Sequence, residues 1–154
     1  MDPFSIVTTS ATLVDRCAKL TEYLYKYVKK IQNVDMAVQV LQLEITTLQR
    51  VLGSIGTSFS DPAMAQVALE TLTGHEAQHW ENVKRSMEDC EVTLTDLDKI
   101  LENVTNVGDG FFRRAKTQVK LDMKSTKMTL LKQQVTAYRQ TMQLSLQMLT
   151  VYFP

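Results

Sequence analysis

The strongest constraint in this sequence is the spacing of its apolar residues, which recur every three or four positions along much of the chain. The pattern is nearly free of errors in two segments: Val34, Val38, Leu41, Ile45, Leu48, Leu52, Ile55, and Trp80, Val83, Met87, Cys90, Leu94, Leu97, Leu101, Val104. This spacing places apolar side chains on one face of an α-helix. Each stripe is roughly 30–36 Å long, a length typical of helical bundles. No segment alternates with period two for long enough to form a strand.

Capping and turn residues predict where the first two helices begin and end. The first helix is expected from about Pro3 to Ile31, with an apolar face formed by Val7, Ala11, Val14, Ala18, Leu20, Leu24, Val28 and Ile31. Asn33 is the expected cap of the second helix, and Gly56 is expected to end it. Residues 57–61 are expected to form a Ser-rich loop.

The second half of the chain predicts one short helix and two long ones. Asp61 and Pro62 favour a short helix over residues 62–72, and a third long helix is expected over residues 74–104. Residues 106–110 have the composition of a turn, and the last helix is expected from about Arg114. Its predicted core positions are Met128, Leu131, Val135, Tyr138, Met142, Leu146 and Leu149. We therefore predict an all-α fold, an up-and-down bundle of four long helices plus one short helix, in one domain spanning residues 1–154.

Cysteine content and the N-terminus indicate a cytoplasmic protein. Cys17 and Cys90 are far apart and form no CxxC motif, which is typical of free thiols in a reducing compartment. No stretch approaches the roughly 20 apolar residues of a membrane-spanning helix. The first residues, Met-Asp-Pro, lack the basic start of a signal peptide. The last helix carries no charge after Arg139, so we also expect this chain to be the N-terminal part of a longer protein.

Charge is unevenly distributed although the formal net charge is zero. Residues 61–109 sum to −8 and residues 110–154 to +7. In the basic segment, Lys116, Lys120, Lys124 and Lys127 have the spacing of one helix face, which suits anionic lipid. The favoured interpretation is instead antiparallel pairing with the acidic third helix, through Glu88, Asp89, Glu91, Asp96, Asp98 and Glu102, and nucleic-acid binding is a third possibility. Nucleic acid is disfavoured because no aromatic residues lie between the basic ones.

One motif matches the HExxH pattern of zinc metalloproteases, at His75, Glu76 and His79. A catalytic zinc needs a third protein ligand, and Asp98 would lie roughly 28 Å farther along the same helix. Thr73 and Glu76 also fit a capping box at the start of the third helix. No phosphate-binding loop or nucleophile-base pair accompanies the motif. We expect no enzyme activity, no catalytic or metal-binding residues and no cofactor.

The opening Met1-Asp-Pro-Phe-Ser-Ile-Val7, followed by a helix that ends in aromatic residues and lysines, resembles fungal HeLo and HeLo-like domains. The resemblance extends to the second helix, the stretch from Trp80 to Cys90 and the leucine-rich last helix. Such domains stand at the N-terminus of STAND receptors and ankyrin-repeat proteins, and are related to the four-helix bundle of the mixed-lineage kinase-like pseudokinase. The resemblance implies a signalling domain that self-associates and acts at the plasma membrane in regulated cell death.

The implied membrane or oligomerisation segment comprises Phe4, Ile6, Val7, Ala11, Leu13 and Val14. The implied partners are a second copy of the chain, other proteins and anionic membrane, the last through Lys116, Lys120, Lys124 and Lys127. The alternative is a structural or adaptor bundle without membrane activity. Exposure of Phe4, Ile6 and Val7 would favour the membrane-acting domain, and their burial would favour the adaptor.

Overall fold

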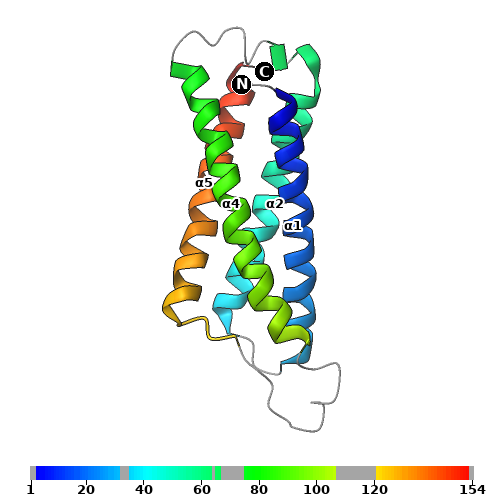
Figure 1. Cartoon of the computed structure of the whole chain (residues 1–154), viewed down its shortest axis with the longest axis vertical. Coiled ribbons are helices and arrows are strands. Elements are labelled where there is room, and N and C mark those ends of the chain that lie inside the picture. Colours follow the sequence, from blue (N-terminus) through cyan, green and yellow to red (C-terminus); the bar gives the residue numbers. More distant parts are fainter. Residues whose placement is uncertain (1–2, 32–34, 64, 67–74, 107–120, 153–154) are drawn as a thin grey trace.

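The computed structural model describes residues 3–31, 35–63, 65–66, 75–106 and 121–152. Within them lie four long helices and no strand: α1 (Pro3–Lys30), α2 (Met36–Ser60), α4 (His75–Asn106) and α5 (Thr126–Tyr152). Successive helices run in opposite directions along an elongated bundle (Figure 1). The predicted all-α fold of long helices is thus confirmed. Of the predicted short helix only residues 62–63 and 65–66 are described, and they are helical, so a complete fifth helix is not shown.

The four helices form a ring in which each contacts two neighbours. Helix α1 packs against α2 and α4, and α5 packs against the same two helices. As a result α1 and α4 run parallel on one side of the bundle, and α2 and α5 run parallel on the other (Figure 1). The antiparallel neighbourhood of α4 and α5 agrees with the arrangement expected from the sequence.

The core contains the predicted stripes of α2, α4 and α5 together with buried residues of α1. Every described residue of the two main stripes is buried, while Val34 and the side chain of Val104 lie outside the described part of the chain. In α5, Met128, Leu131, Val135, Met142 and Leu149 are buried, and Tyr138 and Leu146 are half-buried against the same core. Each fully buried Leu or Ile contributes about 1.5–3 kcal/mol relative to exposure, so this single cluster provides most of the stabilisation.

The apolar face predicted for the first half of α1 is wrong. Ala11 and Ala18 are exposed, and Val7 and Val14 are only half-buried. The core instead receives the stripe one residue earlier, formed by Ile6, Ser10, Leu13 and Cys17. Because α1 contacts both α2 and α4, its buried face is set by where these two helices lie. The larger side chains of Ile6 and Leu13 fill the core in place of two alanines.

Helix α2 begins later and ends later than predicted. Its cap is Asp35, not Asn33, because the Asp35 carboxylate accepts a hydrogen bond from the Ala37 N–H at 3.0 Å. Gly56 does not end the helix, and residues 57–60, predicted as a loop, are helical. Their hydroxyls donate to carbonyls four residues earlier, in the bonds Thr57 to Gly53, Ser58 to Ser54 and Ser60 to Gly56.

Helix α5 begins at Thr126, well after the predicted Arg114. Residues 121–125 are not helical, and residues 107–120, with most of the predicted turn, lie outside the described part of the chain. The N–H of Leu121 donates to the buried Tyr27 hydroxyl of α1 at 2.9 Å. The hydroxyl of Ser125 accepts from the Met128 N–H at 3.2 Å and so caps α5. The helix start therefore depends on a cap and a contact with α1, neither of which follows from apolar spacing.

Candidate functional site

The predicted N-terminal segment does not present one exposed apolar face. The Phe4 side chain is 71% exposed, but Ile6 and Leu13 are fully buried in the core. Val7 and Val14 are half-buried, and Ala11 is exposed. Exposure of Phe4 thus favours the membrane-acting domain, burial of Ile6 favours the adaptor, and the half-buried Val7 favours neither. Among the described residues, none of the helices combines the length and apolar character needed to cross a bilayer.

Two of the four candidate lysines, Lys124 and Lys127, lie in the described part of the chain. Lys124 lies in the turn before α5, and Lys127 lies in the first turn of the helix. Both are exposed, whereas Lys116 and Lys120 lie outside the described residues. Residues 121–125 are not helical, so Lys124 and Lys127 do not share a helix face, and the prediction for Lys116 and Lys120 stays a prediction.

The described ion pairs do not join the acidic α4 to the basic α5. Asp98 of α4 instead contacts two cations of α1, Arg16 at 3.6 Å and Lys19 at 3.4 Å. The hydrogen bond to Asp98 raises the pKa of Lys19. Helices α4 and α5 are linked by neutral groups, since the Thr93 hydroxyl donates to Gln134 at 3.1 Å. The carboxylate of Asp98 is nearly buried and fastens α1 to α4.

The HExxH motif acquires no third ligand in the described part of the chain. The side chains of His75 and Glu76 lie outside it, and the described residues contain no group of three or more potential metal ligands. The His79 ring packs edge-on against Trp80, with ring centroids 5.3 Å apart. Burial lowers the pKa of His79, which favours the neutral ring. Trp80 in turn packs edge-on against Phe59, so this end of α4 is an aromatic packing cluster.

The two sides of the bundle differ strongly in charge. Helices α1 and α4 contain 18 charged residues, whereas α2 and α5 contain five, Glu44, Arg50, Lys127, Lys132 and Arg139. The lengths of the two pairs are similar, so the difference is one of composition. A helix face in water usually carries many charges, and depletion of charge is typical of protein interfaces.

The charge-poor side also exposes large apolar residues. On α2, Met36, Val40 and Leu43 follow at i, i+4 and i+7 and are 72%, 45% and 63% exposed. On α5, Leu130 and Leu144 are 52% and 58% exposed, but both lie around the helix nearer to Gln134, which contacts α4, than to Arg139, which contacts α2. Sequence analysis missed these residues because it assigned α2 one apolar stripe. The signal was a second stripe at helical spacing on the same helix.

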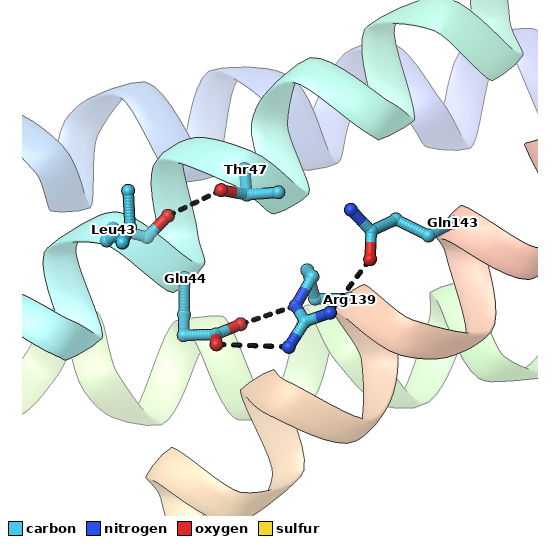
Figure 2. A network of polar contacts seen from close by, with 5 residues as sticks. All are labelled: Leu43, Glu44, Thr47, Arg139 and Gln143. Carbon is cyan, nitrogen blue, oxygen red and sulfur yellow. Dashed lines mark hydrogen bonds and ion pairs between the residues drawn. The ribbon is translucent and has the colours of Figure 1, made fainter.

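An ion pair in the middle of this side neutralises two of its five charges. The Arg139 guanidinium donates to both Glu44 carboxylate oxygens, at 2.6 and 3.1 Å, and to Gln143 at 2.8 Å (Figure 2). The bond to Glu44 raises the pKa of Arg139. Close to this network, the Thr47 hydroxyl donates to the Leu43 carbonyl at 2.9 Å (Figure 2). The pair fastens α2 to α5 without adding net charge.

These residues define a surface that we call the α2/α5 face. Its exposed or half-buried members on α2 are the uncharged Met36, Val40, Leu43 and Thr47, and on α5 it includes Gln143, which contacts Arg139. The paired Glu44 and Arg139 join α2 to α5 beside these residues, and Lys132, seven residues before Arg139, lies on the same side of α5. The arrangement offers side-chain contacts to another molecule.

The described fold places this chain in the class of all-α helical-bundle proteins. Comparisons with family models, curated proteins and solved structures find no match.

Proposed function

We propose that this chain is a non-enzymatic signalling domain that works through protein-protein contacts. Its resemblance to HeLo-like domains suggests the N-terminal position in a STAND-type receptor, where such a bundle would transmit a signal by association. The observation that carries the proposal is the α2/α5 face, where exposed apolar residues coincide with a lack of charge.

Single exposed apolar residues on a protein surface need no explanation. Met36, Val40 and Leu43 differ because their spacing lines them up along α2. Aligned apolar residues on a helix can enter the groove of another helical protein. Their neighbours are amides and hydroxyls, which keep the face soluble while it is free and impose little cost when it is covered.

The test is site-specific photocrosslinking in cells that express the intact chain. A photoreactive amino acid replaces Leu43 on the α2/α5 face, and in a matched control it replaces Val92 on α4, which is exposed to a similar degree, 64% against 63%. We expect protein adducts at position 43 and few at position 92. Equal yields at both positions, or none at either, would contradict the proposal.

A second candidate function is membrane association through the start of α1. It is favoured by the 71% exposure of Phe4. Deeper insertion of α1 would require Ile6 and Leu13 to leave the core, and each would forfeit about 1.5–3 kcal/mol of burial. The test is flotation with anionic liposomes and dye leakage from them. Phe4→Asp should abolish membrane binding if this candidate is correct, whereas Val92→Asp should preserve it.

A further inference from the structure

We infer that His79 is an acid-sensitive contact of this bundle. The neutral His79 ring keeps closed the end of the bundle at which α4 begins, and protonation of the ring opens that end. The starts of α1 and α4 and the ends of α2 and α5 lie together there (Figure 1). The inference goes beyond the proposed function, because it does not involve the α2/α5 face.

The His79 ring belongs to an aromatic cluster that joins α4 to α2. Its centroid lies 5.3 Å from that of the Trp80 ring, which in turn lies 4.8 Å from that of Phe59, and both pairs are edge-on. Trp80 and Phe59 are each only 4% exposed. Because α2 and α4 are not neighbours in the ring of helices, Phe59 and Trp80 meet across the core. A displacement of the His79 ring therefore disturbs the contact that closes this end.

The Nε2 atom of His79 is buried and has no hydrogen-bond partner among the residues that the structure describes. A neutral imidazole carries a proton on one nitrogen only, so Nε2 can remain an unprotonated acceptor. The imidazolium carries a proton on both nitrogens, and protonation would then bury a charged N–H donor without an acceptor. Such a group is costly to bury. Protonation therefore favours a state in which Nε2 reaches water, and this state requires the cluster to open.

The other helices that meet at this end carry their charges far from His79. The nearest charged residues within them are Asp15 of α1, Arg50 of α2 and Arg139 of α5, each about 15 Å or more along its helix from this end. Asp61 directly follows α2 and is exposed to solvent, which screens its charge. A His79 cation would thus gain little from opposite charges on α1, α2 or α5.

The charged neighbours on α4 itself do not share the face of His79. Glu81, Lys84 and Arg85 follow at two, five and six residues, and these spacings place them on other sides of the helix. Glu76, three residues earlier, has a side chain outside the described part of the chain. Burial lowers the pKa of His79 from its usual 6.5. The contact is therefore fully stable above pH 6.5 and loses stability as the pH falls below that value.

The first measurement is an NMR titration of the two histidines in the intact chain, with the signals assigned by His79→Gln. We expect a pKa below 6.5 for His79. A pKa at or above 6.5 would overturn the inference. It would show that attraction of the cation to the Trp80 ring or to Glu76 outweighs burial.

The second measurement follows the opening through Trp80, the only tryptophan of the chain. Acrylamide quenching of its fluorescence reports how far solvent reaches the ring. We expect the quenching constant to rise at least about twofold from about pH 7.5 to about pH 5.0, the range in which histidine titrates. Far-ultraviolet circular dichroism should show the same helix content at both pH values, because the opening is local.

Two variants test whether His79 is the sensor. In His79→Gln, whose side chain does not titrate, the quenching constant should be the same at both pH values. The matched control His75→Gln removes the other histidine and should respond to pH as the wild type does. Equal quenching of the wild type at both pH values would overturn the inference. The same rise in His79→Gln as in the wild type would also overturn it, because another group would then be responsible.

Discussion

Two glycines in α2, Gly53 and Gly56, allow a test of how closely α1 packs against α2. A Cβ atom at Gly56 would lie 3.2 Å from the Cβ of Ser10, whereas a Cβ at Gly53 would lie 4.0 Å from the nearest atom of Val14. Both positions are helical, so alanine at either site gains about 1 kcal/mol of helix propensity. Only the alanine at position 56 meets a neighbour that cannot rotate away, because the Ser10 Cβ is fixed to the backbone of α1.

The two substitutions should therefore change the unfolding free energy by different amounts or in opposite directions. Gly53→Ala should stabilise the bundle by about 0.5–1 kcal/mol and raise Tm by about 2–4 °C. Gly56→Ala should lose that gain, since α1 and α2 must move apart and overpacking costs about 1–3 kcal/mol. The expected difference in unfolding free energy between the variants is thus about 1–3 kcal/mol.

Urea unfolding followed by circular dichroism measures this difference. A Ser10→Gly background supplies the control, because removal of the Ser10 Cβ removes the atom that the new side chain meets. In that background Gly56→Ala should become as favourable as Gly53→Ala. Equal stability of the two alanine variants in the wild-type background would refute the close approach as the reason for glycine at position 56.

Three further predictions concern charged and titratable groups. Asp98→Asn should lower the unfolding free energy by about 1 kcal/mol in urea unfolding, because a nearly buried carboxylate loses its charged hydrogen bond to α1. Burial raises the pKa of Cys17 from 9.0 to about 12 and also raises that of Cys90, so the neutral thiols stabilise the fold fully below pH 9. As pH rises from 9 towards 12, the unfolding free energy falls by up to about 1.4 kcal/mol per pH unit for each thiol. In Cys17→Ala the fall should be smaller, because one of the two thiols is absent. A double-mutant cycle of Glu44→Gln and Arg139→Gln should give a coupling of about 0.5–1 kcal/mol that shrinks at high salt.

Each of these three predictions has a control or an outcome that would contradict it. Asp15→Asn, at an exposed site on α1, should change stability by less than about 0.5 kcal/mol, and an equal loss at both aspartates would contradict the role of burial. The Cys17 prediction fails if the wild type and Cys17→Ala lose stability equally between pH 8.5 and 10.5. A coupling that does not depend on salt would show that the Glu44–Arg139 pair acts through packing.

The long helices could be predicted because their stripes are purely local patterns. The apolar stripe residues between Val38 and Ile55 and between Trp80 and Leu101 occupy the core as their spacing predicts. A helix that exposed such a stripe would lose several kilocalories per mole of burial, so almost any fold of this sequence must cover it. The start of α1 at Pro3 also follows from local preference.

Helix ends and the exact buried face of α1 were predicted less well. Gly56 has the local preference of a helix end, yet it lies inside α2 because only a glycine admits Ser10 of α1 so closely. The core side of the first half of α1 was assigned one residue off, because two alanines and two valines matched the helical period as well as Ile6 and Leu13 do, whereas Leu20, Leu24 and Ile31 are buried as predicted. The choice between such stripes depends on contacts with other helices.

The candidate site likewise depends partly on local sequence and partly on contacts between helices. The sequence alone determined that the chain forms long amphipathic helices and that charge is uneven along it, since both are properties of the order of residues. Only the tertiary structure decided which helices became neighbours, and so brought the charge-poor α2 and α5 to one side of the bundle. Glu44 and Arg139 are far apart in the chain, and they form an ion pair because the ring of helices places α2 beside α5. Apolar period specifies which face of a helix is buried, but it does not specify the helix that covers it.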